Sequence, residues 1–215
     1  LGVYILRTFY QEAKLRKEFV IMDTTDTTRL IKDCMEELSI DPKQYDPRTI
    51  KTIISNAKNA GKNIFDFEAD IYNPVTDNAV KIWRVYEQKK QAEHALDFDD
   101  LLIKTKELLE TNADVRTKLQ NKFKYVHIDE YQDTNEIQYQ VAKILAGTAH
   151  NICAVGDTDQ NIYSWRGANI KNMLNFERDF PGTVTILLEQ NYRSTKNILS
   201  VADAIITKNT ARIDK

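Results

Sequence analysis

Residues 124–133, KYVHIDEYQD, decide the predicted fold, because an apolar run ends there in two adjacent carboxylates, Asp129 and Glu130. Two more β-rich runs follow, NICAVGD at 151–157 and TVTILLEQN at 183–191. Their apolar residues are continuous rather than alternating, and helical spacers such as IQYQVAKILAG separate them, which is typical of a parallel sheet covered on both faces. We therefore predict an α/β fold that binds ligands at the carboxyl ends of its strands.

Upstream of these runs the apolar residues keep helical spacing. The capping residues of DTTDTT, Asp46-Pro47 and Asn73-Pro74 each predict the start of a helix, and ALDFDDLLIKTKELLE at 95–110 predicts another. The first 19 residues, LGVYILRTFYQEAKLRKEF, read as one amphipathic helix. The charged residues of this helical part, including Lys89 and Lys90, are expected to form a solvated face.

The composition limits the kinds of partner that the chain is expected to bind. The net charge of -2, from 30 basic and 32 acidic residues, favours a local groove over a wholly basic face for any polyanion. Cys34 and Cys153 lie in apolar runs and are predicted to be buried free thiols in a reducing cytoplasm, with a disulfide as the alternative. No apolar run approaches the roughly 20 residues of a membrane span, so we expect no membrane contact.

The strand ends carry the residues from which chemistry is inferred. An apolar strand that ends in an aspartate is how nucleotide hydrolases hold magnesium, since a hard cation prefers carboxylate and water oxygens. Asp129 is the candidate ligand, and the neighbouring Glu130 is placed to orient and deprotonate an attacking water. The alternative is a solvated pair of acids where a strand meets a loop.

Two later stretches add aromatic and basic side chains. In GDTDQNIYSWRGA at 156–168, Tyr163, Trp165 and Arg166 suit unpaired nucleic acid, because bases stack on aromatic faces and a guanidinium meets a phosphate. The alternative is that Trp165 is a core residue. In QNYRST at 190–195, Arg193 is placed to stabilise charge on a transferring phosphoryl group, with a surface salt bridge as the alternative.

Together these stretches resemble motifs of the superfamily-one DNA helicases of the UvrD, PcrA and Rep group. VHIDEYQDTN resembles the Walker B motif, AVGDTDQNIYSWRGA the motif that couples ATP to DNA, and LLEQNYRST the motif at the junction with the second motor domain. LDFDDLL at 96–102 and NFERDFPG at 175–182 also resemble the group, so the resemblance spans most of the chain.

The resemblance implies a role for each candidate residue. It implies that Asp129 binds Mg²⁺, that Glu130 is the general base, and that Gln160 senses the γ-phosphate of ATP and relays its presence to the DNA-contacting loop. Further implied roles are single-stranded DNA contact for Tyr163, Trp165 and Arg166, adenine stacking for Tyr192, and an arginine finger for Arg193.

The resemblance also implies an architecture, a partial RecA-like P-loop NTPase sheet with an inserted all-helical subdomain. The implied segments are a helix of the first motor domain at 1–14, the helical accessory subdomain at 15–94, the remainder of the first motor domain at 95–194, and the start of the second at 195–215. None of the six glycines falls in a G-x-x-x-x-G-K-[ST] pattern. We therefore expect an internal piece of a longer protein, with negligible ATP hydrolysis alone and an exposed apolar edge or face in its incomplete sheet.

The implied parent is an ATP-dependent helicase that translocates 3′ to 5′ on single-stranded DNA and unwinds duplex DNA, with repair or replication proteins as partners. Two alternatives stay open: a non-enzymatic module that binds DNA or a protein partner through a degenerate motor, and the motor part of a helicase–nuclease.

Overall fold

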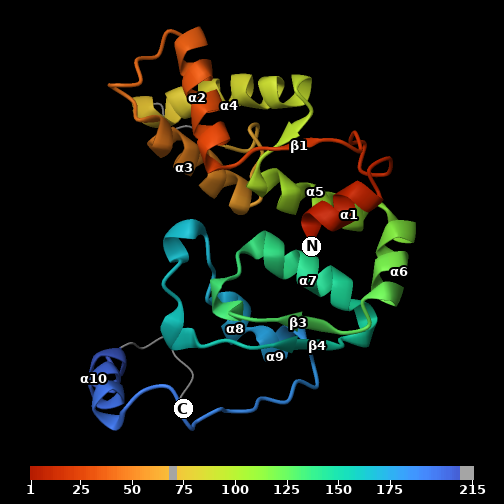
Figure 1. Cartoon of the computed structure of the whole chain (residues 1–215), viewed down its shortest axis with the longest axis vertical. Helices are drawn as coiled ribbons and strands as arrows, with labels where there is room; N and C mark the ends of the chain where they lie inside the picture. Colours follow the sequence, from red (N-terminus) through yellow and green to blue (C-terminus); the bar gives the residue numbers. More distant parts are fainter. Residues whose placement is uncertain (68–71, 209–215) are drawn as a thin grey trace. The chain divides into compact units, whose positions relative to one another are not determined.

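The computed structural model describes residues 1–67 and 72–208, with the side chain of Arg166 outside the described part. The chain divides into two compact units (Figure 1). Unit 1 comprises Leu1–Lys124 and Glu136–Gly147, and unit 2 comprises Tyr125–Asn135 and Thr148–Lys215.

Unit 1 is mainly helical. Its short parallel sheet pairs Val20 with Ala95 and Ile21 with Leu96. In chain order its elements are α1 (Gly2–Thr8), β1 (Val20–Ile21), α2 (Thr24–Glu37), α3 (Pro47–Asn59), α4 (Pro74–Ala92), β2 (Ala95–Leu96), α5 (Phe98–Thr111), α6 (Ala113–Lys122) and α7 (Glu136–Ala146).

Side-chain caps begin α2, α3 and α4 where the sequence predicts them. The Asp23 carboxylate accepts the backbone N–H groups of Thr25 and Asp26, in a capping box that starts α2. Asp46 starts α3 by accepting the Arg48 N–H, with Pro47 in the first turn, and Asn73 starts α4 by accepting the Val75 N–H. Caps satisfy N–H groups that have no partner within the helix, so these starts are determined locally.

The N-terminal helix is shorter than predicted. It ends at Thr8, and residues 9–19 form turns in which Lys14 takes a positive φ of 55°. Between residues 11 and 18 only Ala13 and Leu15 are apolar. A helix there would have almost no apolar face to bury, and burial of such a face supplies most of the stability of a helix.

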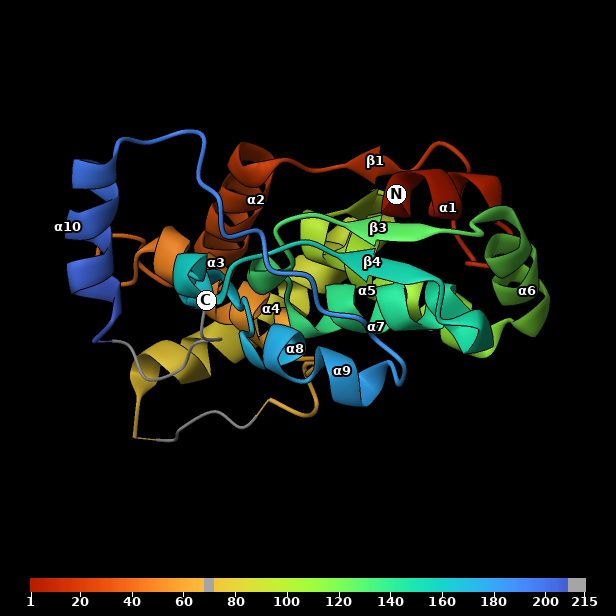
Figure 2. The same cartoon turned by 90° about the horizontal axis from the view of Figure 1, so that it is seen from below.

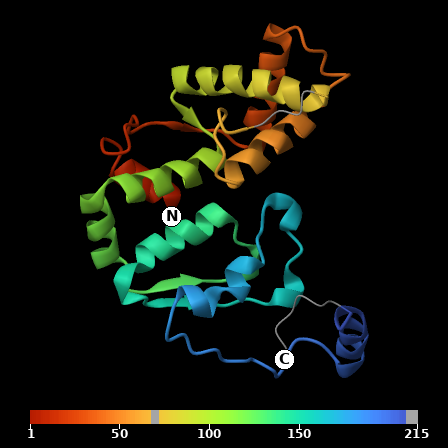
Figure 3. The same ribbon diagram turned by 180° about the vertical axis from the view of Figure 1, so that it is seen from behind.

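The helices α2, α3 and α4 lie beside one another (Figure 3). Their buried apolar side chains form one continuous core. Ile31, Ile50 and Ile82 are fully buried there, one from each helix. Each such side chain contributes roughly 1.5–3 kcal/mol by leaving water. The core consists of Met22, Leu30, Ile31, Cys34, Met35, Ile50, Ile54, Ala57, Ala79, Ile82, Trp83, Tyr86 and Ala95.

A buried group of charges joins α3 and α4 to the start of α5. The Lys58 ammonium lies 2.9 Å from Asp97, 2.8 Å from Asp100 and 2.8 Å from Glu87. Lys90 contacts the same three carboxylates and is 2% exposed. The prediction that Lys90 lies on a solvated face is therefore wrong, because the two aspartates that cap α5 need buried cationic partners.

Mutual attraction keeps this group ionised despite its burial. Burial alone would lower the pKa of Lys58, but Asp100, Asp97 and Glu87 raise it well above its usual range. Burial alone would also raise the pKa of Asp97, yet Lys58 and Lys90 lower it far below its usual range. The charges are thus stable only as a set.

Unit 2 contains a second parallel pair of strands, β3 (Val126–Ile128) and β4 (Ile152–Ala154). Both strands lie where the sequence predicts them, and they run side by side in Figure 2. The mixed α/β class is therefore confirmed. The other elements of unit 2 are the short helices η1 (Tyr131–Asp133), η3 (Thr158–Gln160), η4 (Ser164–Arg166), α8 (Lys171–Leu174) and α9 (Phe176–Asp179), and the longer α10 (Lys196–Ile206). The 3-10 turn η2 (Gly147–Ala149) leads into β4.

The third predicted strand does not form. Residues 183–191 have no regular secondary structure, and Val184, Ile186 and Leu188 are 80%, 76% and 86% exposed. A strand needs a neighbour for its backbone hydrogen bonds, and within the described chain β3 and β4 pair only with each other. These exposed apolar side chains lie outside the sheet, so the expected apolar edge or face of an incomplete sheet stays a prediction, and a sheet covered on both faces is not seen among the described residues.

The two cysteines differ. Both are free thiols, and Cys34 is buried as predicted, with burial raising its pKa to about 11. Cys153 is exposed on β4, so the prediction of its burial is wrong. A side chain in a strand faces one side of the sheet, and this side of β4 is uncovered.

Replacing Lys58 by methionine should lower the free energy of unfolding by roughly 3–5 kcal/mol, because the buried Asp97 and Asp100 and the half-buried Glu87 would share one ammonium. Urea unfolding followed by the fluorescence of the buried Trp83 measures the loss. Lys81→Met is the matched control, since Lys81 makes an exposed ion pair with Asp77 worth about 0.3–0.5 kcal/mol. Equal losses in both variants would show that the buried charges do not stabilise unit 1.

Candidate functional site

Parallel pairing places the carboxyl ends of β3 and β4 at one edge. Ile128 pairs with Ala154, so Asp129 and Val155 are the next residues on the two strands. The contact continues past the strands, because the N–H of Val155 donates to Ile128 O at 2.8 Å and the N–H of Tyr131 donates to Val155 O at 2.9 Å. The segments that follow the two strands are therefore held against each other.

Asp129 and Glu130 are both exposed at this edge. The Oδ1 atom of Asp129 accepts the Glu130 N–H at 3.0 Å. Glu130 takes a left-handed conformation, with φ 50° and ψ 45°, which costs a residue other than glycine roughly 1–3 kcal/mol. The chain thus turns sharply at the pair of acids and presents both carboxylates at the strand end.

Gln132 connects this turn to the segment after β4. It is 1% exposed, and its Nε2 atom donates to Glu130 Oε2 at 2.8 Å. Its Oε1 atom accepts the Asp157 N–H at 3.0 Å, and its main-chain oxygen accepts Asn161 Nδ2 at 2.5 Å. One buried side chain therefore links the end of β3 to the end of β4.

The turn after β4 orients Gln160. Asp157 accepts the Asp159 N–H at 2.9 Å and the Gln160 Nε2 at 3.0 Å, while Thr158 is buried beneath the turn. Gln160 itself is exposed. The structure thus brings Asp129, Glu130 and Gln160 to one edge, joined through Gln132 and Asp157.

The aromatic pair lies just beyond this turn. The rings of Tyr163 and Trp165 have centroids 6.4 Å apart, tilted by 47°. Tyr163 is 36% and Trp165 63% exposed, so the alternative of Trp165 as a core residue is wrong. The side chain of Arg166, the third predicted DNA contact, lies outside the described part of the chain.

Tyr192 and Arg193 lie on an exposed turn formed by Asn191, whose Oδ1 atom accepts the N–H groups of Arg193 and Ser194, each at 2.9 Å. Tyr192 is 92% exposed. Among the described residues, Arg193 makes no ion pair, and no hydrogen bond or ring contact joins either residue to the strand ends. The structure does not bring them to the other candidate residues.

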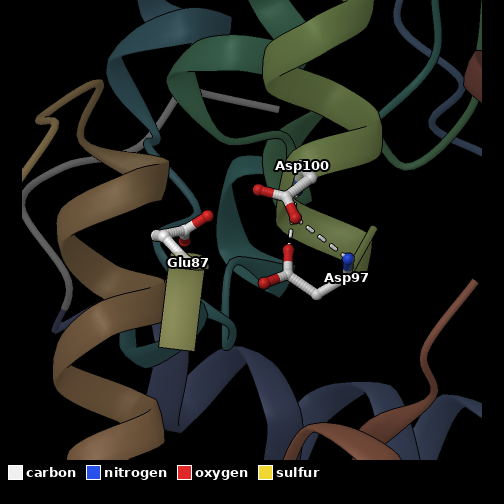
Figure 4. Close-up of side chains that lie close together, drawn as sticks. All are labelled: Glu87, Asp97 and Asp100. Carbon is white, nitrogen blue, oxygen red and sulfur yellow. Dashed lines mark hydrogen bonds between the residues drawn. The ribbon is translucent and has the colours of Figure 1, made fainter. Parts of the chain in front are cut away.

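Among the described residues, one group of carboxylates has the spacing of a metal site. Three carboxylates that lie within ligand distance of one another, Glu87, Asp97 and Asp100, face one another in Figure 4. Lys58 and Lys90 already fill that space with ammonium groups, so the cluster does not suit a metal. Asp129 offers a single exposed carboxylate, which fits Mg²⁺, an ion that keeps several waters and takes few protein ligands beside substrate phosphates.

Two residues near the site carry no obvious signal in the sequence. Asp133 has its Oδ1 atom buried without a hydrogen-bond partner in the described chain, and burial, followed by the charge of Glu130, raises its pKa. Gln132 is the second residue that carries no obvious signal in the sequence. Gly156, a glycine two residues after β4, is the available clue, because a glycine can mark a close approach of two backbones.

The sequence profile of the UvrD/REP helicase N-terminal domain matches residues 1–181, and the chain belongs to this family. It is similar to the ATP-dependent DNA helicase PcrA of Leuconostoc citreum, with 43% identity over 215 residues, which is 100% of this chain and 29% of that protein. The PcrA proteins of Staphylococcus epidermidis and Staphylococcus aureus are also 43% identical, over 213 residues and 29% of their length. The chain thus spans less than a third of these curated relatives.

None of the described helices is long and apolar enough to cross a membrane.

Replacing Gly156 by alanine should loosen the link between the two strand ends. A Cβ atom there would lie 2.6 Å from Gln132 Oε1 and 3.2 Å from the Tyr131 nitrogen, and such overpacking costs roughly 1–3 kcal/mol. Faster hydrogen exchange of the Tyr131 amide would report the loss. In the Gln132→Ala background the effect should shrink, since the nearest atom is removed. An unchanged exchange rate in Gly156→Ala would contradict the close packing.

Proposed function

We propose that the protein carrying this chain is an ATP-dependent DNA helicase, and that residues 95–194 form the remainder of its first RecA-like motor domain. The observation that carries the proposal is the hydrogen-bonded connection from Glu130 through Gln132 and Asp157 to Gln160, directly before an exposed aromatic pair. A motor needs a hydrolytic site connected to a nucleic-acid contact. Family membership and the printed function of the similar PcrA proteins support the proposal.

The acids at the end of β3 carry the proposed hydrolysis. Asp129 would hold Mg²⁺, which would supply positive charge to offset the negative charge that develops on the transferring phosphoryl group. Glu130 accepts a proton from the attacking water and orients it. Gln160 senses the γ-phosphate from the neighbouring turn, and Asp157 holds its amide ready for this contact.

Tyr192 and Arg193 complete the proposed nucleotide site. Tyr192 stacks on the adenine, and Arg193 stabilises the charge of the γ-phosphate. Both side chains are exposed on a turn set by Asn191, so they are accessible to a ligand. Their approach to the strand ends belongs to the nucleotide-bound state.

The proposed DNA contact comprises Tyr163, Trp165 and Arg166. Stacking of a base on an exposed aromatic ring contributes about 1–3 kcal/mol and tolerates any sequence, which suits a motor that moves along single-stranded DNA. We propose 3′-to-5′ movement, unwinding of duplex DNA, and cooperation with repair or replication proteins.

The remaining segments are assigned accordingly. Residues 1–14 belong to the first motor domain, 15–94 form an inserted helical accessory subdomain, and 195–215 begin the second motor domain. The separate core of α2, α3 and α4 supports an accessory subdomain within unit 1. The exposed apolar side chains of α10, Ile198, Val201 and Ile205, support its assignment to a domain that continues beyond this helix.

Replacing Glu130 by glutamine in the full-length protein should lower its DNA-stimulated ATPase turnover roughly 10²–10⁴-fold, because the amide cannot accept the proton of the attacking water. Steady-state ATPase assays with saturating single-stranded DNA measure this. Glu110→Gln serves as the control, since Glu110 makes an exposed ion pair with Lys106.

Turnover should be unchanged in Glu110→Gln. Equal turnover in the wild type and Glu130→Gln would refute the role of Glu130, and absence of DNA stimulation in the wild type would refute the helicase proposal.

A further inference from the structure

We infer that Gln132 is a positioning residue, which holds the Glu130 carboxylate against the turn at 157–161 and so fixes the general base relative to Gln160. This inference rests on the function proposed above. Gln132 is 1% exposed and donates to the Glu130 carboxylate, so it acts through Glu130 and not on the nucleotide.

The chemistry of the amide matches both of its partners. One end of the group donates to a carboxylate at 2.8 Å, and the other accepts a backbone N–H at 3.0 Å. An amide supplies a donor and an acceptor together, whereas a carboxylate offers only acceptors once ionised and a thioether offers neither in useful strength. A glutamate at this position would place a second negative charge against Glu130.

The backbone around Gln132 is held on both sides. The ring of Tyr131 packs edge-on against Phe176, with centroids 5.3 Å apart. The Nδ2 atom of Asn172 donates to Thr134 O at 3.1 Å. Because its neighbours are anchored to the helices that follow η4, the backbone that carries the Gln132 amide is held in place, as the support of a catalytic group requires.

Gly156 leaves the space in which this connection forms. A Cβ atom at this position would lie 2.6 Å from the Gln132 Oε1 atom that accepts the Asp157 N–H. No larger residue leaves room for the amide in its present place. The glycine after β4 and the glutamine after β3 therefore belong to one arrangement.

The inference is tested by steady-state ATPase kinetics of the full-length protein. Gln132→Glu keeps the size and the acceptor toward Asp157 but repels Glu130. We expect kcat to fall roughly 10- to 100-fold, the loss typical of a catalytic group misplaced by about 1 Å, with KM for ATP changed less than about twofold. We expect the same fall in kcat for Gln132→Met, which adds no buried charge. This variant therefore serves as the test if Gln132→Glu does not fold.

A double variant separates positioning from a general structural role. In the Glu130→Gln background, Gln132→Glu should cause no further loss of kcat, because its effect passes through the missing carboxylate. Gln140→Glu is the matched control, since Gln140 donates to Glu136 at 2.9 Å in α7, in the other compact unit, and its kcat should match the wild type.

Three results would overturn the inference. The first is a wild-type kcat in both Gln132→Glu and Gln132→Met. The second is that Gln132→Glu lowers kcat by the same factor in the wild-type and Glu130→Gln backgrounds. The third is that Gln140→Glu lowers kcat as much as Gln132→Glu does. If Glu130→Gln alone loses no activity, the proposed function fails instead, so the two failures are distinguishable.

Discussion

Parallel strands bring their carboxyl ends to the same edge of a sheet, and in unit 2 this constraint acts through only three paired residues on each strand. Such a short ladder fixes the relative positions of the paired residues but of few residues beyond them. The buried amide of Gln132 extends the connection, because it contacts Glu130 on one side and Asp157 on the other. The arrangement of the acids, the turn with Gln160 and the aromatic pair all depend on this extension. The left-handed conformation of Glu130 persists because these contacts over-determine it.

Much of the fold is predictable because its signals are local. Caps at Asp23, Asp46 and Asn73 start helices wherever the chain lies in space, and helical spacing identifies the faces that form the core. The errors come from non-local effects. The sequence pattern of α4 predicts that Lys90 is a surface residue. Its ammonium is instead paired with Asp97 and Asp100, which lie at the start of a different helix, α5. Residues 183–191 have the composition of a strand, yet strand formation needs a partner, which the described chain does not supply.

The acids after β3 and the glutamine after β4 are predictable from the sequence, whereas the residue that connects them is not. Asp129, Glu130 and Gln160 follow from motifs with recognisable chemistry, and the structure places them at one edge. Gln132 has no such signal, since a glutamine between two motif residues becomes informative only when its three hydrogen bonds are known. Tyr192 and Arg193 remain predictions, because their turn makes no described contact with the strand ends.

The central claim is that the acids after β3 and the aromatic pair after β4 act as one connected unit. Its most direct test is the affinity of the full-length protein for a fluorescent single-stranded oligonucleotide, measured by anisotropy with and without a non-hydrolysable ATP analogue. We expect the analogue to change the affinity by about 5- to 150-fold, the usual range for coupled sites, and Gln160→Ala to abolish the change while leaving DNA binding intact. Identical affinities with and without the analogue in the wild type would contradict the claim.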